Sequence, residues 1–283
     1  MVLLFNNSKG GVAKTSSVIV IAQILSAAGY KTLIVDLDPQ GNAASMLRAE
    51  ETTNIVKKGN DGYEIVISNQ NLLTDELSKK EVESFVRKTD FLDLEVIPSN
   101  EEMYDVIYDM HNMLPKKSDI FLTLKKNLDK LDEYDYIIID SSPFRSHLID
   151  AAVCAADRVY VPVEADNLSY EGLRSITNHI TKMNETYGLE IELGGVFITK
   201  ANKRTIRFRS MFDGYESQFG DIFIPVAIRQ HESVSKAATA FIPLLQLDKQ
   251  CPAITDYIEL CNYEGLIDKK HYRKLTKYLK NAK

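Results

Sequence analysis

Short apolar runs rich in β-branched residues recur along this chain, and longer segments whose apolar residues have helical spacing lie between them. Several runs are apolar at nearly every position, which is typical of parallel strands buried on both faces. The expected strands are residues 2–5, 32–38, 94–98, 136–140, 158–163, 194–199 and 222–228. The expected helices are residues 14–28, 101–110, 118–131, 146–156, 168–187, 206–218 and 232–240. The alternation predicts an α/β fold with right-handed crossovers, in which helices flank a doubly wound, mostly parallel sheet.

The chain has 283 residues, of which 45 % are hydrophobic and 26 % charged, and this suits one well-packed domain over residues 1–283. Within it we expect a variable polar region at 50–92 and a basic C-terminal helix at 265–283. No apolar run approaches the roughly 18 residues of a membrane span, and the apolar start is too short for a signal peptide. We therefore expect a cytoplasmic protein with small, buried, reduced cysteines at Cys154, Cys251 and Cys261.

The segment NNSKGGVAKTSS, residues 6–17, follows the first expected strand and opens the first expected helix, which is the context of a phosphate-binding loop. Gly10 and Gly11 let backbone N–H groups approach phosphate oxygens, and the helix start adds its positive dipole end. Lys14 would neutralise the β/γ-phosphates, and Thr15 would offer a hydroxyl to Mg²⁺. A second lysine, Lys9, precedes the two glycines.

Carboxylates follow two of the other expected strands. Asp36 and Asp38 lie at the end of the second strand, and Asp140 ends the fourth. The carboxyl ends of parallel strands form the edge at which an open α/β sheet binds its ligand, and Mg²⁺ prefers oxygen ligands. Any one of these residues could simply cap a helix, but together they predict a magnesium site beside the phosphate loop.

Four segments, KGGVAKT, VDLDPQGNAAS, VIPSN and YDYIIIDSSP, strongly resemble the deviant-Walker-A ATPases of the ParA/MinD group, and the small ParA-type (Soj-like) partition ATPases in particular. RVYVPVEAD, GGVFITKANKRT and IPVAIRQHES extend the resemblance over most of the chain. The resemblance implies a P-loop NTPase fold and an ATPase that uses ATP and Mg²⁺.

The family's site residues carry over at matching positions. Lys9 matches the signature lysine that reaches the partner's ATP across a sandwich dimer, and Lys14 and Thr15 match the phosphate lysine and the Mg²⁺ hydroxyl of the same chain. Asp38 matches the aspartate that positions the attacking water, and Asp140 the Walker-B aspartate on the metal side. The implied catalytic residues are Lys9, Lys14 and Asp38; the metal residues are Thr15, Asp38 and Asp140; the nucleotide-binding residues are Lys9, Gly10, Gly11, Val12, Ala13, Lys14, Thr15 and Ser16.

The chain departs from the family pattern at several places. Ala13 stands where family loops commonly have glycine and Ser8 where they have glutamine, and we expect the methyl group of Ala13 to be tolerated. After Asp140 the sequence runs Ser141-Ser142-Pro143-Phe144-Arg145, which alters the family's second switch, so that partner coupling is expected to differ. Arg145 and His147 fit solvated surface better than a functional role.

A basic cluster lies near the end of the sixth expected strand. The formal net charge of −6 confines any nucleic-acid site to a local patch of this kind. Arg204 and Arg229 match positions at which ParA proteins hold DNA-contacting arginines, so the resemblance implies non-specific DNA binding. The predicted DNA-binding residues are Lys200, Lys203, Arg204, Arg207 and Arg229. No base-reading motif is visible, so we expect phosphate contacts and a steep salt dependence.

The expected function is therefore that of a ParA-type ATPase that segregates plasmid or other low-copy DNA. It would form a homodimer with ATP on the nucleoid, and a centromere-binding adaptor of the ParB type would stimulate hydrolysis. The alternative is a MinD-like positioning ATPase on the membrane, although the apolar stripe of the basic C-terminal segment is narrow for an anchor. A tyrosine kinase with a related loop is a third class, but Tyr257, Tyr263, Tyr272 and Tyr278 are dispersed rather than clustered.

Overall fold

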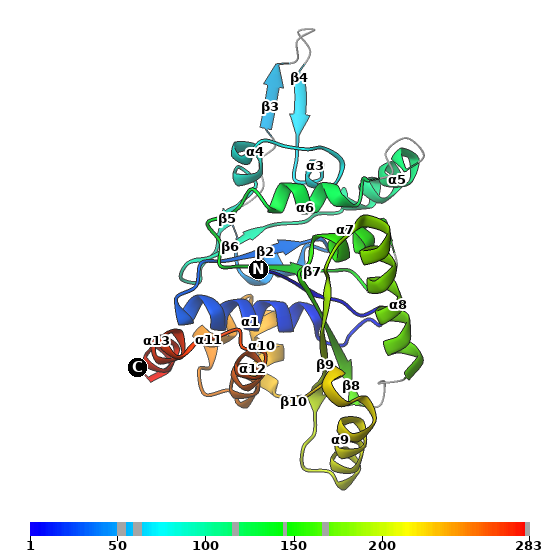
Figure 1. Ribbon diagram of the computed structural model, residues 1–283. Helices are drawn as coiled ribbons and strands as arrows, with labels where there is room; N and C mark the ends of the chain where they lie inside the picture. Colours follow the sequence, from blue (N-terminus) through cyan, green and yellow to red (C-terminus); the bar gives the residue numbers. More distant parts are fainter. Residues whose placement is uncertain (50–54, 59–63, 115–118, 144–145, 166–169, 281–283) are drawn as a thin grey trace.

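The computed structural model describes residues 1–49, 55–58, 64–114, 119–143, 146–165 and 170–280. In these residues eight strands form one sheet in the order β10-β9-β8-β1-β7-β2-β6-β5, with helices on both faces (Figure 1). All neighbouring pairs are parallel except β5 and β6, which are antiparallel. The strands are β1 (Val2–Phe5), β2 (Thr32–Asp36), β5 (Arg87–Lys88), β6 (Leu94–Ile97), β7 (Tyr136–Asp140), β8 (Arg158–Glu164), β9 (Glu192–Ala201) and β10 (Phe223–Arg229). The predicted doubly wound, mostly parallel sheet is confirmed.

The sheet separates two apolar cores because successive side chains of a strand point to opposite faces. Leu3 and Phe5 of β1 and Ile138 of β7 belong to one core, whereas Leu4 of β1 and Ile139 of β7 belong to the other. All of these side chains are buried, which explains why the strands are apolar at consecutive positions in the sequence.

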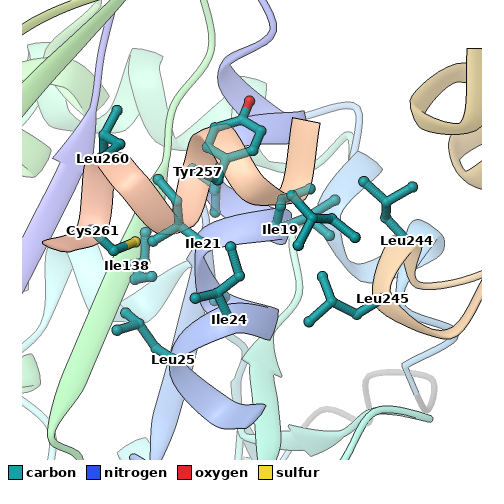
Figure 2. Packing of buried hydrophobic residues seen from close by; sticks show 14 of the residues in the cluster. Ile19, Ile21, Ile24, Leu25, Ile138, Leu244, Leu245, Tyr257, Leu260 and Cys261 are labelled. Atoms are coloured by element: carbon teal, nitrogen blue, oxygen red, sulfur yellow. The ribbon is translucent and has the colours of Figure 1, made fainter. Parts of the chain in front are cut away.

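The first core is built around the helix that follows the phosphate loop. This helix, α1 (Lys14–Ala28), packs between the sheet and the helices α11 (Leu244–Leu247), α12 (Pro252–Tyr263) and α13 (Lys269–Lys280). In Figure 2, Ile21 and Ile24 of α1 lie among Ile138 of β7, Cys261 of α12 and Leu245 of α11. The position of α1, and with it the phosphate loop, is therefore fixed by several buried contacts.

The other helices are placed by the remaining strand connections. Six were expected at nearly the observed bounds: α5 (Met103–Met113), α6 (Leu122–Leu128), α7 (His147–Ala155), α8 (Tyr170–Tyr187), α9 (Ile206–Phe219) and α10 (Glu232–Ala240). Residues 118, 168 and 169, the starts of two expected helices, lie outside the described residues. The sequence did not predict α2 (Asn42–Met46), α3 (Asn71–Thr74), α4 (Lys79–Glu83), α11, α12 or the short 3₁₀ helix Gly220–Ile222.

The polar region at 50–92 contains a separate hairpin, β3 (Ile55–Lys58) and β4 (Glu64–Ile67), whose strands are antiparallel. In Figure 1 it extends beyond α3 and α4, away from the sheet. Residues 50–54 and 59–63 of this region lie outside the described residues.

The basic C-terminal segment contains α13, and this helix packs against α1 (Figure 1). Leu275 is 1 % exposed, and the His271 ring stacks on Tyr30 with 3.9 Å between ring centroids. A Cβ atom at Gly29, the C-cap of α1, would lie 2.8 Å from Lys274 Nζ. Leu275 is therefore covered within the chain, whereas Tyr272 of the same helix is exposed. None of the described helices has the length and apolar character needed to span a bilayer.

Candidate nucleotide site and basic cluster

The phosphate loop spans the gap between β1 and α1 and is held by side chains of the loop and of the sheet. Asn7 donates from Nδ2 to the Pro162 carbonyl (2.9 Å) and accepts the Lys9 N–H at Oδ1 (2.9 Å). The buried Thr199 hydroxyl of β9 lies 3.1 Å from both the Val12 and the Val163 carbonyl oxygens. Sequence reasoning missed both anchors, since no local pattern marks a buried strand threonine as a loop support.

The backbone of the loop has the form that glycine permits. Gly11 has a φ of +78°, and a Cβ atom built on Gly10 or on Gly11 would meet no atom of the described chain within 4 Å. The space next to these two backbones is therefore open to phosphate oxygens. Ala13 has a φ of +62°, in the left-handed region, and precedes α1 as its N-cap. Alanine adopts this conformation only at a cost, so the backbone at Ala13 is strained in a way that the sequence did not indicate.

The two lysines of the loop differ in environment. Lys14 is 7 % exposed, and its Nζ lies 3.3 Å from the Lys9 carbonyl oxygen. Burial lowers the pKa of Lys14, and the negative charges of Asp140 and Asp38 oppose this shift. The Lys9 side chain is exposed. One lysine is thus fixed inside the site of its own chain, and the other is accessible from outside it.

The carboxylates after β2 have different roles. Asp36 is 1 % exposed and accepts hydrogen bonds from the N–H groups of Asp38 (3.0 Å) and Ala43 (3.0 Å), so it holds the turn that leads into α2. Asp38 is half-buried, and its Oδ1 accepts the Gln40 N–H at 3.0 Å. The structure therefore gives Asp36 a structural role and leaves Asp38 as the more accessible carboxylate of the pair.

Asp140 ends β7 and is fully buried. Neither of its carboxylate oxygens meets a hydrogen-bond partner in the described chain. Burial raises the pKa of Asp140 to about 7, and the nearby Thr15 hydroxyl and Lys14 ammonium oppose this shift. The Thr15 hydroxyl is close to the carboxylate but does not form a hydrogen bond with it. A buried, unpartnered carboxylate beside a threonine hydroxyl fits a hard divalent cation. Thr15, Asp38 and Asp140 are thus suited to hold Mg²⁺, directly or through water, and this ion would neutralise phosphate charge when bound.

The five predicted DNA-binding cations lie at the ends of β9 and β10, in the turn that leads into α9 and in the first turn of α9. Lys203 Nζ lies 3.0 Å from Asp256 Oδ1, and Arg229 Nε lies 2.8 Å from Asp256 Oδ2. Asp256, on α12, is 2 % exposed and also accepts the Arg229 N–H at 2.8 Å. Lys200 pairs with Glu164 at 2.9 Å.

Nothing in the sequence indicated the role of Asp256, which partly neutralises this cluster and holds Lys203 and Arg229 side by side. Arg204 is exposed and has no ion pair among the described residues, so it is the more accessible cation. Arg207 is exposed as well. The basic cluster that we expected is present as a surface feature, with Asp256 as its buried organising anion.

A cavity of about 1510 Å³ opens beside the first loop residues, between α5, α7 and α8. It is lined by Ser8 and Pro143 but not by Gly10–Ser16, so it is distinct from the phosphate cradle. Phe144 and Arg145 of the altered switch lie outside the described residues.

The cavity also contains histidines that the sequence did not connect. His147 lies 3.3 Å from His111 and 3.4 Å from Asp150, and His179 lies 2.9 Å from Asp150. Burial alone would raise the pKa of Asp150, but the hydrogen bonds from His179 and His147 hold this pKa below its usual range. His147 is half-buried in this network, so the expected solvated surface is wrong at that position.

A glycine-rich loop between a parallel strand and a helix, with carboxylates at the ends of the neighbouring strand β7 and of β2 beyond it, defines a P-loop nucleotide-binding protein. Residues 1–193 match the AAA domain family. The chain belongs to this family, and it is a member of the ParA/MinD group of deviant-Walker-A ATPases.

Individual relatives and solved structures are similar to the chain over most of its length. The chromosome-partitioning ATPase Soj of Treponema pallidum is 29 % identical over 91 % of this chain and 94 % of its own length. The McdA(D38A)–ATP complex of Cyanothece superposes with a TM-score of 0.75 at 20 % identity, over 93 % of this chain and 96 % of that one. Cobyrinic acid a,c-diamide synthase of Mycobacterium smegmatis, with a bound ATP analogue and magnesium, has a TM-score of 0.65 at 27 % identity, over 85 % and 90 %.

Proposed function

We propose that this protein is a partition ATPase of the ParA type, which hydrolyses ATP with Mg²⁺ and acts on DNA as a nucleotide-dependent homodimer. The difference between Lys14 and Lys9 carries the proposal. Lys14 is buried beside its own loop, whereas Lys9 is exposed on the same loop and is available to the phosphates of a second chain. A lysine delivered by a partner acts as an arginine finger does, so that dimer formation completes the charge neutralisation that phosphoryl transfer needs.

In this proposal the residues of the site have separate roles. Loop N–H groups and Lys14 bind the phosphates, and Thr15 and Asp140 hold Mg²⁺. Asp38, the accessible carboxylate after β2, orients the attacking water. Hydrolysis is slow until a partner arranges the segment after Asp140.

The basic cluster is the proposed DNA surface. Lys203 and Arg229 are joined through Asp256, and Lys200, Arg204 and Arg207 lie within four residues of Lys203 in the chain, so a dimer would present this cluster twice. Contacts of this kind go to phosphates and do not read bases, so binding would be non-specific and would decrease with salt. We propose that the dimer resides on nucleoid DNA and that a centromere-binding adaptor of the ParB type stimulates hydrolysis and release, which segregates plasmid or other low-copy DNA.

A membrane-bound, MinD-like function is less well supported. Two of the apolar residues of α13 contact other parts of the chain, whereas Tyr272 is exposed: Leu275 is buried against α1, and Tyr278 lies beside Phe91 and under Lys249 Nζ. Membrane binding would require this packing to be released.

The decisive experiment compares the two lysines in separate variants. In Lys9→Ala we expect a fluorescent ATP analogue to bind a single chain, and light scattering with ATP to report a monomer where the wild type forms a dimer. In Lys14→Ala we expect nucleotide binding itself to fail.

Lys88→Ala, an exposed lysine on the edge strand β5, serves as the matched control and should dimerise like the wild type. An ATP-dependent dimer of normal stability in Lys9→Ala would refute the proposed role of Lys9.

A further inference from the structure

Three side chains from two loops converge near the start of α10 and the connection between α11 and α12. His231 precedes α10, Asp248 follows α11, and Cys251 precedes α12. One ring nitrogen of His231, one carboxylate oxygen of Asp248 and the Cys251 Sγ lie within 4.8 Å of one another. Cys251 is 1 % exposed, whereas His231 and Asp248 are half-buried. Three potential metal-ligating atoms therefore lie close together, one on a buried side chain and two on half-buried side chains.

The two half-buried members are already held by neighbouring groups. Asp248 Oδ2 accepts the Ser233 hydroxyl at 2.6 Å, and Asp248 Oδ1 accepts the Gln250 N–H at 3.1 Å. The Ser233 N–H donates to His231 Nδ1 at 3.3 Å, and the Cys251 N–H donates to the Asp248 carbonyl at 3.1 Å. Hydrogen bonds to a carboxylate orient it as a metal ligand, whereas the Ser233 N–H occupies the acceptor lone pair of His231 Nδ1, which a metal at that nitrogen would have to displace. Each carboxylate oxygen retains a lone pair, and the bond to the ring is long enough for a metal to displace.

The donor set selects the class of metal. Imidazole, carboxylate and thiolate together suit Zn²⁺ and similar divalent transition metals, whereas Mg²⁺ and Ca²⁺ prefer oxygen donors throughout. Ligands that share a tetrahedral zinc lie about 3.3–4 Å apart. The observed separations therefore need adjustments of less than about 1.5 Å, which loop residues at helix ends can make. Three protein ligands leave a fourth position for water.

We propose that His231, Asp248 and Cys251 form a binding site for zinc or a similar divalent transition metal, separate from the magnesium site at the phosphate loop. The ion would tie together the starts of α10 and α12 and the end of α11. Pro252, the residue after Cys251, accepts Arg229 Nη2 at its carbonyl (3.0 Å), so the site adjoins the anchor of the basic cluster. The site does not depend on the proposed partition function.

Cobalt is the probe, because a thiolate bound to Co²⁺ gives a charge-transfer band in the near ultraviolet that oxygen and nitrogen ligands do not give. Reduced, metal-free protein is titrated with Co²⁺ in the presence of excess Mg²⁺ and without nucleotide. We expect one equivalent to bind with the thiolate band, and Zn²⁺ to bleach the band by displacement. The wild type should also gain thermal stability with zinc.

Two variants make the test specific. Cys251→Ser should lose the thiolate band, and His231→Ala, which changes a half-buried side chain, should weaken Co²⁺ binding at least tenfold. Cys261→Ser, a change of another buried cysteine on the same helix, should retain the band. Absence of the band at stoichiometric cobalt, or its persistence in Cys251→Ser, would overturn the proposal. If Cys251→Ser does not fold, His231→Ala decides: unchanged Co²⁺ affinity in that variant overturns the site equally.

Discussion

Asp36 and Asp140 are register partners at the carboxyl ends of β2 and β7, and both carboxyl groups are buried. Burial, and then the charge of Asp140, raises the pKa of Asp36 well above its usual range. The two residues nevertheless differ, because Asp36 accepts two backbone hydrogen bonds and Asp140 accepts none from the described chain. The carboxyl group of Asp36 therefore supports the fold, and that of Asp140 is suited to bind a cation.

The first prediction concerns Asp140→Asn. The folded pKa of Asp140, about 7, exceeds the value of about 4 in the unfolded chain, so the folded state binds this proton more tightly. Its contribution to stability is complete below about pH 4 and is lost as the pH rises toward about 7. In urea unfolding without nucleotide, we expect Asp140→Asn to lose less stability than the wild type between about pH 5 and about pH 7.5.

The same variant should gain no stability from Mg²⁺ and ATP, whereas the wild type should. Asp93→Asn, a change of an exposed carboxylate, should behave like the wild type in both assays. An unaltered pH profile in Asp140→Asn would mean that Asp140 is already ionised in the ligand-free protein.

The second prediction concerns Ala13→Gly. A left-handed alanine costs the folded state about 1–2 kcal/mol, and glycine would remove this strain. Glycine also makes the unfolded chain more flexible, which lowers the free energy of unfolding by about 0.4–1 kcal/mol. We expect Ala13→Gly to raise the free energy of unfolding by about 0.5 kcal/mol, measured by urea denaturation of ligand-free protein.

Ala238→Gly within α10 is the opposite control, since glycine in a helix interior should destabilise by about 1 kcal/mol. Destabilisation in Ala13→Gly would show that the methyl group of Ala13 contributes more than its backbone strain costs.

The third prediction concerns Asp38→Ala. Because Asp38 is placed to orient water rather than to hold the phosphates, we expect the variant to bind ATP and to dimerise while hydrolysis decreases by about 100-fold or more. Phosphate release and light scattering on the same sample give both results. Gln40→Ala should keep its hydrolysis rate, since the bond to Asp38 comes from the Gln40 backbone. A variant at Asp38 that stays monomeric with ATP would contradict the role assigned to this residue.

The fourth prediction concerns Arg204→Glu. Arg204 is exposed and lacks an ion pair in the described part of the chain, so reversal of its charge should weaken ATP-dependent DNA binding about tenfold or more at low salt. The slope of log affinity against log salt should decrease by about 1 or more, and ATPase activity without DNA should persist. Lys88→Glu reverses a charge at the opposite edge of the sheet and should leave DNA binding intact. Equal losses in the two variants would indicate a general charge effect and no local DNA surface.

Seven of the eight strands of the sheet, and the place of the glycine-rich loop between a strand and a helix, were predictable from the sequence because their signals are local, whereas the two-residue edge strand β5 was not predicted. Fully apolar runs give parallel strands, and the loop lies between a strand and a helix as its glycines require. The buried helix α12 was not predicted: Ile254, Tyr257 and Leu260 are covered on several sides, so the helix has too little contrast between faces to show a clear period.

The unpredicted parts of the sites depend on tertiary contacts. Asp256 meets Lys203 and Arg229 only because α12 packs beside β10. The strain at Ala13 is likewise a property of the folded loop. The sequence shows that alanine replaces the family's glycine, but it does not show the positive φ angle that favours glycine there.

The packing of α13 on α1 has a practical consequence for reporter fusions. Helix α1 begins at Lys14, in the phosphate loop, and ends next to Tyr30, whose ring stacks on His271 of α13. Helix α13 therefore supports the end of α1 that lies away from the phosphate loop. A tag that replaces residues 269–280 would remove the packing of α13 on α1, the helix that begins at the phosphate loop. A fluorescent label on this protein is therefore safer when it is attached through a long linker beyond an intact α13.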